Sequence, residues 1–117
     1  MSFESDLYQR LLSVCPNVYP DFAPSNTARP FITYAQIGGS AIQPLGKEVP
    51  NRRLALVQVN VWSDTRSATT ALMLQVDAAM RTATAFDAQA NAEFTSVTDE
   101  ETGLRGAIQD FKCVGYR

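Results

Sequence analysis

The strongest constraint on this fold is a strand that runs into a helix with almost no loop between them. Residues 53–64 read RLALVQVNVWSD, and the residues that follow read TRSATTALMLQVDAAMRTA. The first run is rich in Leu and Val and predicts a strand over residues 52–63. The second run repeats apolar residues at helical spacing and predicts a helix over residues 65–84. Any fold for this chain must therefore join a long strand directly to a long helix.

The predicted strand has one apolar face and one half-polar face. Alternate residues would place four side chains in the core: Ala55, Val57, Val59 and Val61. The opposite face would carry a mixed set: Leu54, Leu56, Gln58, Asn60 and Trp62. Because the second face is half polar, we expect it to meet solvent or a partner. A Trp at the end of such a strand usually belongs to a core or an interface rather than to a stacking platform.

The predicted helix carries a second apolar strip besides its core stripe. The core stripe is expected to contain six residues: Ala68, Leu72, Val76, Ala79, Met80 and Ala83. Leu74 would lie roughly opposite this stripe, because two residues turn a helix by about 200°. Ala71 and Ala78 flank Leu74. This second strip is either ordinary surface or a subunit contact.

The rest of the chain completes a single domain over residues 1–117. The other elements are expected as a helix over 3–14, an irregular connection over 16–29, a strand over 30–37, a Gly- and Pro-rich loop over 38–51, and a hairpin of strands 92–98 and 104–114. Gly38-Gly39 would end the first strand, and Gly103 would supply a positive φ in the hairpin turn. The connection is expected to pack back on the domain through Val18, Tyr19 and Phe22.

The order of these elements is helix, two strands, helix, two strands. It predicts an α+β two-layer sandwich, in which the helices pack on one face of an antiparallel sheet of about four strands.

Composition and charge exclude several classes of protein. The chain is 45% hydrophobic and 19% charged, which fits a globular domain rather than a disordered one. Its formal net charge of −2 gives no overall attraction to nucleic acid or to an anionic membrane. No apolar run approaches the length of a membrane span, and the start MSFESDLYQRLL lacks the pattern of a signal peptide. We therefore expect a protein that is made and kept in a cytoplasm.

Residues suited to catalysis are scarce in this chain. Histidine is absent, which removes the commonest general base and the commonest metal ligand. Cys15 and Cys113 are expected to be buried and reduced rather than joined in a disulfide. No nucleotide-binding motif occurs. We expect no enzyme activity, no cofactor and no metal ion.

Three local features allow both a functional and a structural interpretation. Residues 38–40 could be mistaken for a phosphate loop, but no helix is expected after them, so a chain break is the better interpretation. The acids at 99–101 could attract a hard cation, although solvated side chains at a hairpin tip are the simpler explanation. Lys47, Arg52 and Arg53 give only a weak nucleic-acid signal, because no aromatic residues lie between them.

Several patterns together resemble the tail-terminator, or tail-completion, family of long-tailed bacteriophages. Besides an N-terminal helix, they are VYPDFAP at 18–24, RPFITYAQIGG at 29–39, LVQVNVWSDT at 56–65 and DFKCVGY at 110–116. These are packing motifs rather than catalytic signatures, and they span nearly the whole chain.

The resemblance implies a structural role. Members of the family form hexameric rings on the last ring of the tail tube, stop tube polymerisation and present the surface that joins the filled head. The implied partners are further copies of the chain, the tail tube protein and a head–tail connector protein, with no membrane and no specific nucleic acid. The implied location is the head-proximal end of the virion tail, after assembly in the host cytoplasm. Two alternatives stay open: a head–tail connector or adaptor ring protein, and a small ligand- or nucleic-acid-binding module.

A ring subunit needs two different surfaces that close by rotation. The long loop, the half-polar strand face and the second helical strip could supply such surfaces. The candidate interface residues are Gly38, Gly39, Ile42, Pro44, Leu45, Lys47, Arg52, Arg53, Trp62, Leu74 and Ala78.

Overall fold

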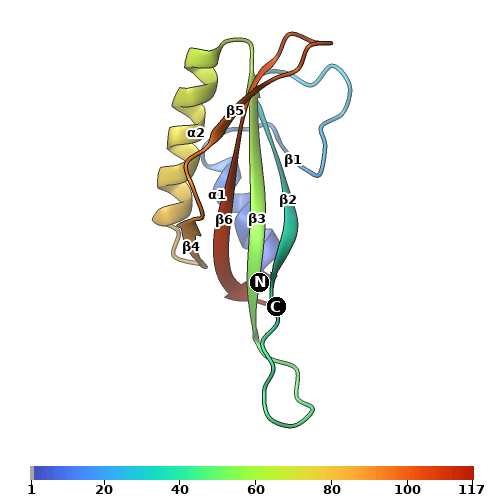
Figure 1. Ribbon diagram of the computed structural model, residues 1–117, viewed down its shortest axis with the longest axis vertical. Coiled ribbons are helices and arrows are strands. Elements are labelled where there is room, and N and C mark those ends of the chain that lie inside the picture. The colour runs from blue at the N-terminus through green and yellow to red at the C-terminus, as the bar shows by residue number, and fades with distance from the viewer. Residues whose placement is uncertain (1) are drawn as a thin grey trace.

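A computed structural model describes residues 2–117, which form two helices and six strands (Figure 1). In chain order the elements are α1 (Phe3–Leu12), β1 (Val18–Pro20), β2 (Phe31–Ser40), β3 (Arg52–Ser63), α2 (Arg66–Arg81), β4 (Asp87–Ala90), β5 (Thr95–Thr98) and β6 (Arg105–Tyr116). The molecule is elongated, with principal extents of 52 × 26 × 24 Å.

The six strands belong to one mixed sheet with the order β1-β2-β3-β6-β4. β5 also pairs with β6, opposite residues 105–108, whereas β4 pairs opposite residues 111–114. β1 runs parallel to β2, and the other pairs are antiparallel. The expected α+β two-layer sandwich built on about four antiparallel strands is therefore wrong. The structure is mostly sheet, with six strands, one parallel pair and two helices in its described part.

The two extra strands are short and have no recognisable pattern of their own. β1 has three residues and ends at Pro20, and β4 is the tetrapeptide DAQA. Periodicity cannot identify runs of this length, so backbone pairing with a long neighbour determines both strands. Val18 in β1 is buried as expected, but Phe22 is 80% exposed. The connection therefore does not pack back on the core at Phe22.

β2 continues through the glycine pair that was expected to end it. A bulge follows Gln36, and pairing with β3 then resumes and runs to Ser40. Gly39 has a φ of +145°, and a Cβ atom there would lie 2.1 Å from the carbonyl oxygen of Leu54. Glycine is needed at this position because two backbones approach closely. The glycine pair marks this close approach and not a break in the strand.

The direct junction between strand and helix is confirmed, because β3 ends at Ser63 and α2 begins at Arg66. Thr65 caps the helix, and its Oγ1 accepts a hydrogen bond from the backbone N–H of Ala68 at 3.2 Å. The expected core stripe is only partly correct, since Ala68 is exposed. The buried residues of α2 are Thr69, Leu72, Met73, Val76, Ala79 and Met80.

Both helices pack on one face of the sheet, and the core lies between them and that face (Figure 1). The core face of β3 is the expected one, and each of its members is at most 4% exposed: Ala55, Val57, Val59 and Val61. α1 contributes Phe3, Leu7 and Leu11, and Ser2 caps it by accepting from Ser5 at 3.3 Å. Phe111 of β6 is fully buried beside them.

The hairpin of β5 and β6 and the state of the cysteines agree with expectation. Gly103 has a φ of +73°, and its N–H donates to the carbonyl of Asp99 at 2.7 Å. Cys15 and Cys113 are both buried and free.

Candidate functional site

A long arm projects from one end of the molecule. We call residues 41–51, which join β2 to β3, the arm. It extends past the end of the sheet along the long axis, at the bottom of Figure 1. Leu45 is 95% exposed and Val49 is 72% exposed, whereas Ile42 and Pro44 are half-buried. The arm therefore presents apolar side chains to its surroundings.

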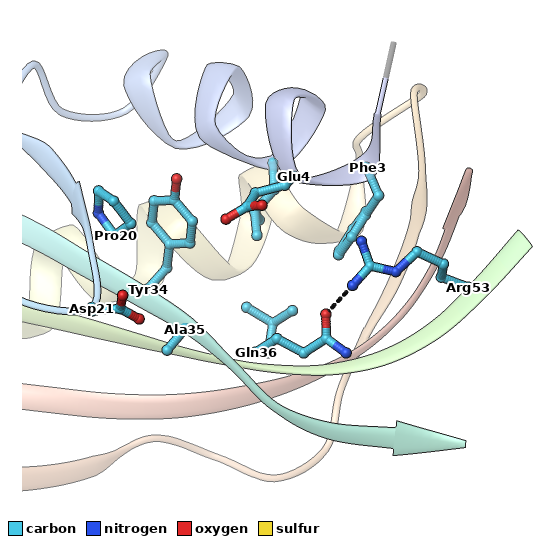
Figure 2. A pocket seen from close by; sticks show the side chains of 10 residues that line it. Phe3, Glu4, Pro20, Asp21, Tyr34, Ala35, Gln36 and Arg53 are labelled. Carbon is cyan, nitrogen blue, oxygen red and sulfur yellow. Dashed lines mark hydrogen bonds between the residues drawn. The ribbon is translucent and has the colours of Figure 1, made fainter. Parts of the chain in front are cut away.

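Arg53, on one side of the base of the arm, contacts both β2 and α1. Its guanidinium donates to Oε1 of Gln36 on β2, and its Cζ lies 5.8 Å from the centre of the Phe3 ring (Figure 2). A cation over an aromatic face is attracted by the negative charge on that face. Arg53 thus links β2, β3 and α1 at the point where the arm begins.

The other side of the base is fastened by residues from the end of β6. The guanidinium of Arg52 lies 5.1 Å from the centre of the Tyr116 ring and donates to its hydroxyl at 3.3 Å. The backbone N–H of Arg117 donates to the carbonyl of Asn51 at 2.8 Å. The Nε of Arg117 donates to the carbonyl of Pro50 at 2.9 Å. The arm therefore projects from a fixed base.

A pocket of about 270 Å³ lies between α1 and β2, next to Arg53 (Figure 2). Glu4 and Asp21 lie on either side of the Tyr34 ring in this pocket. Burial raises the pKa of Tyr34, and the charges of Glu4, Tyr8 and Asp21 raise it further. The phenol is therefore a neutral hydrogen-bonding group at physiological pH.

The sheet face without helices carries a second hollow at the end opposite the arm. This outer cleft has a volume of about 450 Å³ and lies between loop 21–29 and the turn at 99–104. Four residues form its floor: Phe31, Thr33, Asn60 and Trp62. Nδ2 of Asn60 donates to Oγ1 of Thr33 at 3.2 Å. Oδ1 of Asn60 is buried and has no hydrogen-bond partner within residues 2–117.

The charged residues that line the outer cleft are Asp21, Arg29 and Asp99. Arg29 is already paired with Asp64, with 2.8 Å between Nη1 and Oδ1. Among the described residues, neither Asp21 nor Asp99 forms an ion pair. Because Asp21 also lines the Tyr34 pocket, Asp99 is the acid without an ion pair that belongs to the cleft rim alone.

A third surface lies on α2. Leu74 is 55% exposed, and Ala71 and Ala78 are exposed beside it. The second apolar strip predicted for this helix is therefore present.

The structure separates the predicted interface residues into these three regions. Eight of them lie in the arm or at its base, where β2 ends and β3 begins: Gly38, Gly39, Ile42, Pro44, Leu45, Lys47, Arg52 and Arg53. Trp62 lies at the other end of β3, in the floor of the outer cleft. Leu74 and Ala78 lie on α2. Sequence reasoning missed the cleft because its walls are irregular loops that have no periodic pattern.

The described residues show no group of three or more His, Cys, Asp or Glu side chains that could hold a metal ion. Within residues 2–117, each helix is too short or too polar to cross a membrane.

The described residues thus form a small domain with a projecting arm, an open cleft and an outward apolar strip. A family model described as "Tail completion protein gp17" matches residues 6–115. The chain belongs to this phage tail completion family, which makes it a structural component of the virion tail. The resemblance noted in the sequence is thereby confirmed.

Its fold is similar to that of a protein of known structure. One solved chain matches 98% of this chain and 90% of its own length, with a TM-score of 0.57 and 13% sequence identity. No curated protein matches the sequence.

Proposed function

We propose that this protein is the subunit of a ring that closes the head-proximal end of the phage tail tube. The ring, expected to contain six copies, stops tube polymerisation and forms the surface to which the filled head is joined. Its partners are further copies of itself, the tail tube protein and the head–tail connector protein. Assembly takes place in the host cytoplasm, and the protein acts without catalysis or a cofactor. Membership of the tail completion family supports this role.

The observation that carries the proposal is the arm. A single exposed apolar side chain is ordinary on a protein surface. Here Leu45 and Val49 are both largely exposed on one segment that projects beyond the sheet. Arg52 and Arg53 hold the base of that segment. A fixed base lowers the conformational entropy lost when an exposed segment binds a partner. An apolar arm on a fixed base is therefore suited to contact with another protein.

The test is the growth of tail tubes from purified tube protein with and without this protein. We expect tubes to stop growing when the protein is added, and electron microscopy should show extra density at one tube end. A variant with residues 41–51 replaced by a short turn should keep the fold and fail to stop growth. A Thr84→Lys variant, altered at an exposed site outside the arm, should act like the wild type. Continued growth and bare ends with the wild-type protein would contradict the proposal.

A further inference from the structure

The arm and the outer cleft lie at opposite ends of the molecule. Figure 1 shows the arm at one end of the long axis, and loop 21–29 and the β5–β6 turn at the other. The long axis measures 52 Å. The arm of one copy therefore cannot reach the cleft of that same copy, so a contact between arm and cleft would have to join two molecules.

The base of the arm and the rim of the outer cleft have opposite charge. Within the arm, Lys47 is the positive residue and Glu48 the negative one, and Arg52 and Arg53 add positive charge at its base. The outer cleft carries Asp99 on its rim, and the charge of Arg29 is engaged by Asp64. Opposite charges on two surfaces favour their encounter and fix their relative orientation.

Both surfaces also offer apolar groups. The floor of the cleft contains the half-buried rings of Phe31 and Trp62, which offer apolar surface to an entering side chain. Leu45, at 95% exposure, is an apolar side chain without cover. A volume of about 450 Å³ falls within the roughly 300–1,000 Å³ of pockets that hold small ligands. It can admit a few side chains of the arm but not a folded element.

We propose that the arm of one copy docks in the outer cleft of the next copy, with Leu45 against Phe31 and Trp62 and with Lys47 at the acidic rim. This inference rests on the proposed ring and names the contact that holds it together. Each copy uses one arm and one cleft, so the contact is heterologous. A series of such contacts closes into a ring when the rotation between neighbours allows it.

The test uses two variants that each damage one side of the contact. Leu45→Asp places a carboxylate on the arm. Phe22→Lys places a positive charge at the cleft rim, at a residue that is 80% exposed and tolerates substitution. Native mass spectrometry compares the wild type, each variant and their equimolar mixture at a concentration where the wild type forms rings. Thr84→Lys serves as the control for an added positive charge and should form rings.

Each variant alone should be monomeric, because every contact in the ring needs one intact arm and one intact cleft. The mixture should form a heterodimer and nothing larger, because Phe22→Lys supplies an intact arm and Leu45→Asp an intact cleft. If either variant alone forms rings, the proposed contact between arm and cleft is wrong, but the proposed ring is not contradicted. A mixture that stays monomeric would also overturn it. Wild-type protein that forms no ring in solution or on tail tubes would overturn the proposed function as well.

A cross-link tests the contact when rings form only on tail tubes. Gln43→Cys on the arm and Ser25→Cys in the cleft loop are exposed positions, combined in one chain. The natural cysteines are buried and do not compete. Oxidation of tube-bound protein should give a ladder of disulfide-linked oligomers, and each single-Cys variant should give none. Monomer from the double variant, under conditions where tubes are capped, would overturn the contact.

Discussion

Leu72 and Leu74 lie two positions apart on α2 but face opposite surroundings: Leu72 is 8% exposed and Leu74 is 55% exposed. Two residues turn a helix by about 200°, so one side chain enters the core and the other faces solvent. Stability and assembly can therefore be separated by mutations on a single helix.

The first prediction concerns this pair. Leu72→Ala should lower the free energy of unfolding by about 2–5 kcal/mol, because it removes buried contacts and leaves a cavity. Leu74→Asp should change it by about 0.5 kcal/mol or less, since the site is exposed. Denaturant unfolding of both variants measures the difference. Equal losses would contradict the assigned faces of the helix. A parallel tail-binding assay would show whether Leu74 also takes part in assembly.

The second prediction concerns the glycine pair in β2. A Cβ on Gly39 would lie 2.1 Å from the carbonyl oxygen of Leu54, whereas a Cβ on Gly38 would meet no atom within 4 Å. Gly39→Ala must therefore push β2 and β3 apart or strain the backbone, at a cost of roughly 1–3 kcal/mol. Gly38→Ala is the matched control and should cost less. Thermal unfolding of the two variants tests this, and a more damaging Gly38→Ala would contradict it.

The third prediction concerns the base of the arm. Arg53→Ala removes the hydrogen bond to Gln36 and the contact with the Phe3 ring. We expect amide hydrogen exchange in residues 36–53 to become faster, while global stability falls by only about 0.5–1 kcal/mol. Arg53→Lys should rescue only in part, because an ammonium lacks the planar group that stacks on an aromatic ring. Arg66→Ala, on exposed α2 surface, is the control. Unchanged exchange in Arg53→Ala would show that the arm is held by other contacts.

The fourth prediction concerns pH. Burial raises the pKa of Cys113 from 9.0 to about 12. The unfolded chain releases the thiol proton at lower pH than the folded chain, so rising pH favours unfolding. The stabilising contribution of the neutral thiol is therefore complete below pH 9 and is lost between pH 9 and about 12. The free energy of unfolding of the wild type should fall more steeply over this window than that of Cys113→Ala. Parallel curves would contradict the prediction.

The sequence was sufficient to predict the structure where a long element has its own hydrophobic pattern. β3 alternates over twelve residues, so its bounds and its two faces agree with the structure. The caps at Ser2 and Thr65 and the positive φ of Gly103 follow from local chemistry. The helix α2 was placed correctly, but its buried face includes Thr69 and Met73 rather than Ala68. Periodicity locates the buried side of a helix only to within about one residue. Tertiary packing determines which residues at the edges of that side are buried.

The sequence was insufficient where pairing with a distant strand determines the structure. β1 and β4 exist because β2 and β6 offer them backbone partners, so the six-stranded mixed sheet could not be deduced from local pattern. The arm was found as a Gly- and Pro-rich loop, although Gly38 and Gly39 proved to be strand residues. The outer cleft was not found, because it brings loop 21–29, β3 and the turn at 99–104 together from three distant parts of the chain.

The central position of β6 has a consequence for the order of synthesis. β6 pairs with β3, β4 and β5, although it follows all three in the chain. A nascent chain that has reached only the end of β5 therefore has β3 with one edge unpaired, and unpaired edges are templates for association with other chains. Slow translation or truncation before residue 105 should thus yield an aggregating fragment rather than a partly working subunit.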